Sequence, residues 1–367
     1  MTPFNRAGMD FEHIPHPAPV PGETRQQALL DPGFGKLFTD HMVVIDYDAD
    51  KGGWHKATLG PREPISLDPA AAVLHYAQEI FEGMKAYKQG DDSLALFRPE
   101  QNARRFNDSA RRMAMPELPE ELFLESIRQL VAIDRDWVPT IPDGALYLRP
   151  FMFASEAFLG VRPARQYKYI LIASPVGGYF KGGAKAVKIW VSRNYTRAAP
   201  GGTGAAKTGG NYAASLVPQA EGIEHGCDQV VFLDAVEKKW IEELGGMNLF
   251  FVFDDGSVIT PPLTGTILPG ITRDSLIQLL REEGLTVREE PYSIDQWRAD
   301  ATSGRLLETM ACGTAAVVTP VGTVLGPDGE FHIGSGGTGQ ITNKIREKLV
   351  GIQKGAVPDT HGWTVKL

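Results

Sequence analysis

The segment from Gly201 to Tyr212 constrains this chain more than any other stretch. It contains five glycines around a single lysine, Lys207. Glycine allows left-handed backbone conformations and a close approach of the backbone to a ligand. The lysine amine in such a loop is therefore presented to a partner. Three interpretations compete: a lysine that holds a phosphate, a lysine that forms a Schiff base, and an ordinary surface turn.

Length and composition limit the classes of protein to which the chain can belong. Its 367 residues suggest about two domains. A net charge of -8 argues against a general binder of nucleic acids or anionic membranes, and two cysteines far apart in the chain suit a reducing compartment. No apolar run approaches the ~20 residues that span a bilayer, and the N-terminus lacks the pattern of a targeting peptide. We therefore expect a cytoplasmic enzyme or binding protein without a metal site.

Hydrophobic patterning predicts an α+β fold in two domains. An extended N-terminal arm is expected over residues 1–30, because this stretch is proline-rich and lacks periodicity. A smaller α+β domain follows over 31–174, and a glycine-rich interdomain loop over 175–185. A larger α+β domain over 186–367 carries the lysine.

The pattern also places individual elements. Strands are expected over 41–47, 54–59, 81–87, 93–97, 145–154, 167–174, 186–192, 229–234, 249–253 and 308–321, the last with a break at 312–314. Helices are expected over 70–80, 99–113, 119–137, 212–224, 272–283 and 340–354. Asn211 is a candidate N-cap of the helix over 212–224, and Pro218 is expected to kink or interrupt that helix.

A phosphate-binding loop is one interpretation of the lysine segment. Gly201 to Thr208 nearly matches G-x-x-x-x-G-K-[ST], and the strand ending at Asp234 imitates the partner that holds magnesium. However, Ala206 stands where the second glycine belongs, and residues 194–200 separate the loop from its strand. A nucleotide-binding protein therefore remains an alternative.

A Schiff-base lysine makes other demands, which the sequence meets. Pyridoxal phosphate requires an anion beside its ring nitrogen and a cradle for its phosphate, such as a helix N-terminus. Glu242–Asn248 places acids beside a glycine turn, and Leu268–Arg273 leads into a helix. Ala311–Ala316 supplies a turn of small residues with a hydroxyl group. Each signal is weak alone, but their joint order favours this interpretation.

Together these motifs resemble those of the branched-chain amino acid aminotransferases, which are fold-type-IV pyridoxal-phosphate enzymes. The resemblance extends from about Phe34 to Trp363. The matching segments are Phe34–Lys36, Thr39–Met42, Leu74–Tyr76, Phe81–Ala86, Leu146–Pro150, Gly202–Lys207, Gly209–Tyr212, Glu243–Asn248, Leu268–Arg273 and Gly313–Ala315. Other enzymes of the fold, such as a D-amino-acid aminotransferase or an aminodeoxychorismate lyase, remain alternatives, against which Leu74–Tyr76 and the pair Tyr147 and Arg149 argue.

The resemblance implies which residues hold the cofactor, pyridoxal 5′-phosphate. Lys207 would form the Schiff base and carry the proton. Tyr212 would hydrogen-bond the cofactor's phenolic oxygen, and Glu243 would face the pyridine nitrogen, with Glu242 on the opposite face of the strand. The residues implied for the phosphate are Arg105, Ile271, Thr272 and Thr314.

The resemblance also implies the substrates and the assembly. The residues implied for the aromatic wall around an aliphatic side chain are Phe34, Tyr76, Phe81, Tyr147 and Tyr179. Arg149 would hold the second carboxylate of an acidic substrate, and Gly246 with Ala315 would contact the α-carboxylate. The implied reaction is reversible transamination between leucine, isoleucine or valine and 2-oxoglutarate. The implied protein is a homodimer of D-amino-acid-aminotransferase-like chains, with the cofactor at the domain interface.

Overall fold

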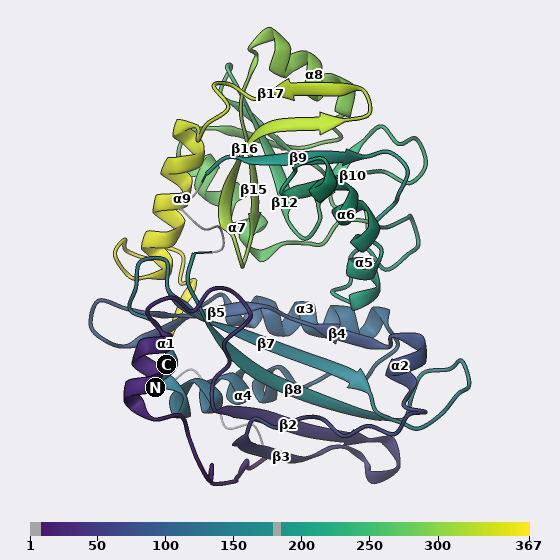
Figure 1. Ribbon diagram of the computed structural model, residues 1–367, viewed down its shortest axis with the longest axis vertical. Coiled ribbons are helices and arrows are strands. Elements are labelled where there is room, and N and C mark those ends of the chain that lie inside the picture. The colour runs from purple at the N-terminus through teal and green to yellow at the C-terminus, as the bar shows by residue number, and fades with distance from the viewer. Residues whose placement is uncertain (1–8, 179–184) are drawn as a thin grey trace. The chain divides into compact units, whose positions relative to one another are not determined.

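The computed structural model describes residues 9–178 and 185–367, which divide into two compact units (Figure 1). Unit 1 contains the described residues up to 178 together with 206–209 and 352–367. Unit 2 contains the described residues of 185–205 and 210–351. Both units combine a sheet with helices, so the expected α+β class in two units is confirmed.

Unit 1 is built on a nine-stranded sheet in the order β1-β3-β2-β8-β7-β5-β6-β18, with β4 paired to β7. Figure 1 shows β7, β8, β2 and β3 side by side. The strands are β1 Glu12–His13, β2 His41–Asp48, β3 Gly53–Pro61, β4 Glu79–Phe81, β5 Met84–Lys88, β6 Leu94–Phe97, β7 Ala145–Ala154, β8 Gln166–Val176 and β18 Thr364–Lys366. The helices are α1 Gly22–Ala28, α2 Ala72–Tyr76, α3 Pro99–Arg112 and α4 Glu120–Ile133.

Two helices complete the core of unit 1. Helix α3 begins with Pro99 in its first turn, where the missing N–H removes no intrahelical hydrogen bond. Helix α4 buries Leu122, Ile127 and Leu130, which recur at helical spacing, in one cluster with residues of β2, β7 and β8. Ile133, the last residue of the helix, is 43% exposed, so the buried face of α4 ends before it.

Unit 2 contains a second nine-stranded sheet, in the order β11-β10-β9-β16-β15-β12-β13-β14, with β17 paired to β16. The strands are β9 Val187–Ser192, β10 Gln229–Leu233, β11 Ile241–Leu244, β12 Asn248–Phe253, β13 Ser257–Thr260, β14 Thr286–Glu289, β15 Leu306–Gly313, β16 Val317–Gly326 and β17 Gly329–His332. The helices are α5 Gly209–Ala213, α6 Leu216–Glu224, α7 Ile271–Glu282, α8 Ile294–Ser303 and α9 Gln340–Gln353, of which α5 and α9 each have an end in unit 1. None of the helices in the described ranges is long and apolar enough to cross a membrane.

The expectation of an extended arm over residues 1–30 is wrong for part of that segment. Gly22–Ala28 form α1, and Glu12–His13 pair with β3. Pro21 stands in an extended conformation immediately before the helix. The residues after it include arginine, glutamine and alanine, which favour helix, so the prolines upstream do not determine their conformation.

The expected helix over 70–80 is too long. Helix α2 covers only Ala72–Tyr76 and ends at Ala77, which has a left-handed φ of 49°. The following residues form β4, whose Ile80 is fully buried opposite Met152 of β7. Sheet pairing and burial outweigh the local helical pattern here, because strand formation depends on packing against neighbours.

The helix expected over 212–224 is two helices, α5 and α6, separated at residues 214 and 215. Pro218 does not interrupt α6, because it is the third residue of that helix. The first N–H groups of a helix have no intrahelical partner, so proline is tolerated there. Asn211 is not an N-cap: it lies inside α5, and its side chain exchanges hydrogen bonds with Thr203.

The observed units and the expected domains differ at two segments. Residues 206–209, which include Lys207, group with unit 1, and so do residues 352–367 at the C-terminus. The C-terminal strand β18 pairs antiparallel with β6, which returns the end of the chain to the first sheet. The described residues before this division end at 178 and those after it begin at 185, both within the segment expected as an interdomain loop.

Candidate active site

The backbone around Lys207 is held at three points by unit 1. Its N–H donates to Ser109 Oγ of α3 at 2.9 Å, and its C=O accepts from Phe81 N of β4 at 2.9 Å. Two residues further on, Gly209 N donates to the Glu79 carboxylate, also on β4. These anchors explain why this short segment belongs to unit 1, and they fix the position from which the lysine side chain extends.

The amine of Lys207 lies over an aromatic ring. Nζ is 4.7 Å from the centroid of Phe81, a distance at which an ammonium group is attracted by the ring face. The side chain is half-buried. Lys207 is therefore presented towards the face of the sheet that carries Phe81.

Arg105 is buried in an ion pair with Glu82. Its Nε and Nη2 donate to the two carboxylate oxygens at 2.7 and 2.9 Å, and Asn102 Nδ2 donates at 2.7 Å. Glu82 is fully buried, which would raise its pKa, but the charge and hydrogen bonds of Arg105 hold the pKa below its ordinary value. Sequence reasoning selected Arg105 but missed Glu82, which fixes the orientation of its guanidinium.

Several of the predicted substrate residues meet on one face of the sheet of unit 1. The rings of Phe34 and Tyr147 are 5.4 Å apart in an edge-to-face arrangement. Arg149 donates to Tyr147 Oη at 3.0 Å, and its guanidinium lies 4.7 Å from the centroid of Phe81. A Cβ at Gly83 would lie 2.1 Å from Tyr147 Oη, so only glycine leaves room for this ring. Phe34, Phe81, Tyr147, Arg149 and Lys207 thus form one cluster.

Of the other residues predicted for the aromatic wall, Tyr76 lies outside this cluster. Tyr76, at the end of α2, is 37% exposed and donates its hydroxyl to Leu159 O. Tyr179 lies outside the described residues. Within the described part of unit 1, the aromatic wall is therefore formed by Phe34, Phe81 and Tyr147.

Unit 2 holds the predicted acid in a second buried ion pair. Glu243 on β11 is 1% exposed and lies 2.6 Å from Arg197 Nη1. Leu268 N also donates to Glu243 Oε1, at 3.2 Å. Arg197 in turn donates to the carbonyl oxygens of Gly245 and Thr266 at 3.1 and 3.2 Å. Arg197 was not predicted, because it follows β9 in an irregular segment with no motif of its own.

Glu242 lies next to this pair but has a different environment. It accepts a hydrogen bond from Thr266 Oγ1 at 2.6 Å, and burial raises its pKa above the ordinary value. Successive residues of a strand point to opposite faces, so the side chains of Glu242 and Glu243 lie on opposite faces of the sheet. This agrees with the expectation that Glu242 faces away from the site.

The start of α7 offers backbone N–H groups without a side-chain cap. The N-cap residue is Gly270, and Ile271 and Thr272 are the first two residues of the helix. The first N–H groups of a helix have no intrahelical acceptor, and the helix dipole favours an anion there. A Cβ at Gly270 would lie 2.1 Å from Asn248 Oδ1, so glycine is required for this close approach.

The remaining predicted residues of unit 2 meet around Gly246. A Cβ on Gly246 would lie 3.4 Å from Tyr212 Cε1, which places the tyrosine ring against this glycine. A Cβ on Gly313 would lie 3.6 Å from Gly246 O. Thr314 and Ala315 belong to the turn that directly follows Gly313 and joins β15 to β16. Unit 2 therefore brings Tyr212, Gly246 and the turn together.

The structure argues against the phosphate-loop alternative, because it gives Asp234 a different role from binding magnesium. The carboxylate of Asp234, the proposed magnesium ligand, accepts hydrogen bonds from four backbone N–H groups. The donors are Val236 and Glu237 at 3.0 and 2.7 Å, and Lys239 and Trp240 at 2.9 and 2.8 Å. Both oxygens shape the loop between β10 and β11, which accounts for this aspartate without a nucleotide.

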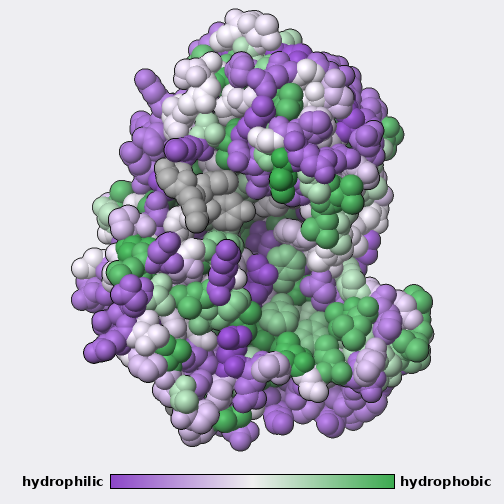
Figure 2. All heavy atoms as spheres, viewed as in Figure 1, coloured by the Kyte–Doolittle hydropathy of each residue, from purple (hydrophilic) through white to green (hydrophobic). Residues whose placement is uncertain are grey.

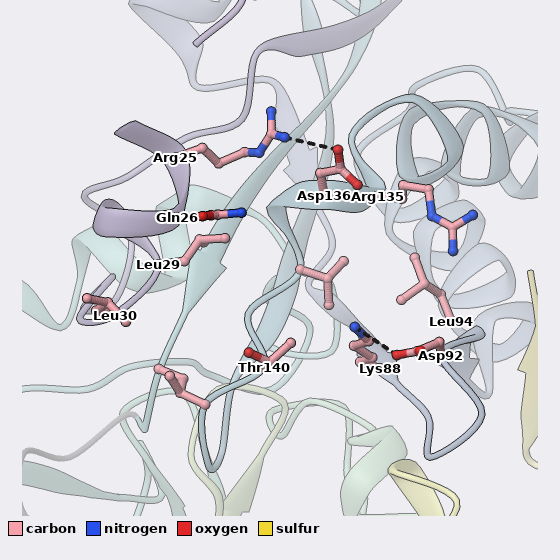
Figure 3. Close-up of a pocket in the computed structure, with 12 residues that line it drawn as sticks. Arg25, Gln26, Leu29, Leu30, Lys88, Asp92, Leu94, Arg135, Asp136 and Thr140 are labelled. Carbon is pink, nitrogen blue, oxygen red and sulfur yellow. Dashed lines mark hydrogen bonds and ion pairs between the residues drawn. The ribbon is translucent and has the colours of Figure 1, made fainter. Parts of the chain in front are cut away.

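A separate hollow of about 640 Å³ lies on unit 1, between α1 and residues 135–141 (Figure 3). Two ion pairs line the hollow, Arg25 with Asp136 and Lys88 with Asp92, each at 2.9 Å. None of the predicted site residues lines it. It is therefore distinct from the cluster around Lys207.

Comparison with known proteins identifies the family. The model of the family described as amino-transferase class IV matches residues 79–324. The branched-chain-amino-acid aminotransferase of Mycolicibacterium smegmatis is 56% identical over 370 residues, covering 99% of this chain and 100% of that protein. The enzyme of the same name from Mycobacterium tuberculosis is 57% identical over 353 residues, covering 95% of this chain and 96% of that protein.

Solved structures agree with this result. The branched-chain amino acid aminotransferase of Escherichia coli has a TM-score of 0.72 at 32% identity, covering 83% of this chain and 95% of that chain. The T.th. enzyme of the same name, solved with pyridoxamine 5′-phosphate, has a TM-score of 0.70 at 28% identity, with coverages of 87% and 97%. The chain belongs to the class IV aminotransferases. Within that class it is a member of the branched-chain-amino-acid aminotransferase family, which confirms the resemblance of its motifs.

Proposed function

We propose that the chain catalyses reversible transfer of the amino group between leucine, isoleucine or valine and 2-oxoglutarate, with pyridoxal 5′-phosphate as its cofactor. The observation that carries this proposal is the 56–57% identity, over nearly the whole chain, to enzymes named for that reaction. We further propose that the protein acts in the cytoplasm.

The residues of the chain fit the cofactor. Bound pyridoxal phosphate withdraws electrons from the substrate carbon and so makes its proton removable. Lys207 is proposed to bond to the cofactor aldehyde and to carry the substrate's α-proton, for which its amine must be neutral. Glu243 would face the ring nitrogen, and the Glu243–Arg197 ion pair supports this role because it gives the buried carboxylate a counter-charge. Tyr212 would bond the phenolic oxygen.

The phosphate is proposed to lie at the start of α7, bound by the N–H groups of Ile271 and Thr272, with Thr314 and the guanidinium of Arg105. The absence of a side-chain cap at this N-terminus supports the proposal, because a capping side chain would occupy the same donors. The assignment of Arg105 is supported by its buried, fixed orientation on Glu82.

The substrate side chain is proposed to lie against Phe34, Phe81 and Tyr147. Apolar burial alone discriminates weakly among leucine, isoleucine and valine, because one methylene group is worth only ~1–3 kcal/mol. Arg149 would bind the second carboxylate of glutamate, and its buried Nε without a hydrogen-bond partner supports this role. Gly246 and Ala315 would contact the α-carboxylate, and Tyr76 and Tyr179 would complete the aromatic wall.

A homodimer is proposed as the functional assembly. Apolar side chains around the end of α2 are exposed: Leu74 at 58%, Leu159 at 63% and Val161 at 87%. Tyr76 donates to Leu159 O, which joins these residues into one surface. Figure 2 shows hydrophobic side chains gathered on the part of the surface that α2 occupies in Figure 1. An exposed apolar patch of this kind marks an interaction surface.

The test begins with the near-visible absorbance of the purified protein supplied with pyridoxal phosphate. Adding leucine should convert the absorbance of the aldehyde form to that of the pyridoxamine form, and borohydride before leucine should attach the cofactor to Lys207. Lys207→Ala should abolish the absorbance change and the reduced adduct. Lys51 has a side chain that is 65% exposed, so Lys51→Ala should behave as the wild type. A reduced adduct on another residue, or a panel in which D-amino acids react and leucine does not, would overturn the proposal.

A further inference from the structure

Glu79 lies on the same face of unit 1 as the substrate residues. In the pairing of β4 with β7, Glu79 is opposite Phe153 and Phe81 is opposite Phe151. Paired residues of antiparallel strands point to the same side, and every second residue of a strand shares a face. Arg149, two residues before Phe151, therefore lies on this face as well. A carboxylate that the family motifs did not single out thus faces the proposed binding surface for substrate.

The carboxylate of Glu79 is fixed beside the lysine segment. It accepts the N–H of Gly209, and a Cβ at Gly209 would lie only 2.3 Å from Glu79 Oε1. This position therefore requires glycine for the contact. Because Phe81 N bonds the carbonyl of Lys207, the short strand β4 holds residues 207–209 at both ends.

The charge of Arg149 lies close enough to act on Glu79 without pairing with it. Burial raises the pKa of Glu79, and the hydrogen bond from Gly209 and the charge of Arg149 reduce that rise. Arg149 donates to Tyr147 Oη and lies over Phe81, and its Nε has no hydrogen-bond partner. No carboxylate among the described residues is within ion-pair distance of this guanidinium. Glu79 is therefore a nearby negative charge that leaves the arginine's donors available.

We propose that Glu79 is a specificity-determining residue: its negative charge weakens the attraction of Arg149 for a second substrate carboxylate and so shifts preference towards aliphatic substrates. This inference rests on the proposed transamination. A ligand carboxylate at Arg149 is repelled by Glu79 through a partly desolvated region, where charges interact more strongly than in water. An aliphatic side chain at the same place carries no charge and is affected little.

The test compares two oxo acids, 2-oxoglutarate and 4-methyl-2-oxopentanoate, in half-reactions of the pyridoxamine form. The dependence of the observed rate on oxo-acid concentration gives the maximal rate and the half-saturating concentration, which are called kcat and KM here. In Glu79→Gln the amide oxygen still accepts from Gly209, while the charge is removed. The ratio of kcat/KM for 2-oxoglutarate to that for 4-methyl-2-oxopentanoate should rise about fivefold, mainly through a lower KM for 2-oxoglutarate. Glu79→Ala also removes the acceptor for Gly209, so its kcat should fall for both oxo acids.

A matched control and a pH profile distinguish charge from structure. Glu121→Gln removes an exposed carboxylate from α4 of the same unit and should leave the ratio as in the wild type. In the wild type the ratio should rise as pH falls through the raised pKa of Glu79, and in Glu79→Gln it should be flat. The charged groups nearby are Arg149, Lys207 and Glu82, and the charge and hydrogen bonds of Arg105 hold the pKa of Glu82 below its ordinary value.

Two results would overturn the inference: an unchanged ratio in Glu79→Gln, or a wild-type ratio independent of pH. Failure of the proposed function is distinguishable, because the wild type would then convert neither oxo acid.

Discussion

The two units each bury an arginine–glutamate pair. The residue proposed to contact the cofactor is the arginine in unit 1 and the glutamate in unit 2. In unit 1, Arg105 is the proposed phosphate ligand, and Glu82 holds it at 2.7 Å. In unit 2, Glu243 is the proposed partner of the ring nitrogen, and Arg197 holds it at 2.6 Å. A buried charge without a counter-charge is costly, so a functional ion of either sign requires an opposite charge behind it.

The pairs also differ in how they are built. Glu82 and Arg105 are 23 positions apart, in the turn between β4 and β5 and in α3. Arg197 and Glu243 lie on separate segments of unit 2, and Arg197 is further fixed by the carbonyls of Gly245 and Thr266. Unit 1 thus fixes its cation through carboxylate oxygens, whereas unit 2 fixes its anion through a cation that is itself held by backbone carbonyls.

The largest effect is expected from breaking the pair in unit 1. Glu82→Ala leaves the guanidinium of Arg105 buried without a counter-charge, which should lower the free energy of unfolding by about 3–5 kcal/mol. Denaturant unfolding of the cofactor-free protein measures this change. Adding Arg105→Met should recover part of the lost stability without recovering affinity for pyridoxal phosphate. If the single and double variants are equally stable, the ion pair does not have the role assigned to it.

In unit 2, removing the charge of Glu243 is expected to slow the reaction. Glu243→Gln keeps the shape of the side chain but removes the charge proposed to face the ring nitrogen. Both half-reactions should slow about a hundredfold at saturating cofactor, a loss typical for one electrostatic group of an active site. Stopped-flow absorbance measures these rates. Glu242→Gln, the neighbouring carboxylate, is the control and should react as the wild type. Normal rates together with a weakly held cofactor would contradict the role of Glu243.

The start of α7 gives a smaller expected effect. Gly270→Ala places a Cβ only 2.1 Å from Asn248 Oδ1, which is too close for two non-bonded atoms. The first turn of α7 must therefore shift. The Kd for pyridoxal phosphate should rise about tenfold, since a weakened hydrogen bond to a charged group accounts for about 1.5 kcal/mol, the lower end of the range for losing one. Fluorescence titration measures the Kd. Gly337→Ala, where the nearest atom would be 3.6 Å away, should leave it unchanged.

The smallest expected effect concerns the pH dependence of stability. The folded-state pKa of Glu242 is raised by burial, so the folded protein holds this proton to higher pH than the unfolded chain. Stability from this group is therefore complete below the unfolded pKa and decreases as pH rises towards the folded pKa. Each unit of that shift is worth about 1.4 kcal/mol. Glu242→Gln should remove this decrease, so the difference in Tm from the wild type should grow as pH rises above the ordinary glutamate pKa of about 4.3. A difference in Tm that stays constant with pH would contradict this role of Glu242.

The motifs of the site could be predicted from sequence because their chemistry is local. The glycines around Lys207, the Glu243-Leu244-Gly245-Gly246 turn and the start of α7 each lie within a few consecutive residues, and their order along the chain identified the family. The strand over 145–154 was likewise predicted correctly, and the strand expected over 229–234 and the helix expected over 272–283 differ from β10 and α7 by no more than one residue at either end, since hydrophobic periodicity and proline placement are local signals.

The errors share one physical cause. Residues 79 and 80 belong to strand β4, although their pattern favoured helix, because β7 provides a pairing edge and buries Ile80. Residues 352–367 belong to unit 1 because β18 pairs with β6, more than 260 positions earlier in the chain. Such pairings depend on which segments meet in space, which no local pattern contains.

The sequence by itself determined the family and the motifs from which the Schiff-base lysine and the other cofactor ligands are proposed, because these depend on short runs of residue types. Only the tertiary structure decided that Glu82 supports Arg105, that Arg197 supports Glu243, and that Glu79 lies beside Lys207 and Arg149. Counter-charges are selected by proximity and desolvation in the folded chain, and both are properties of packing rather than of sequence order.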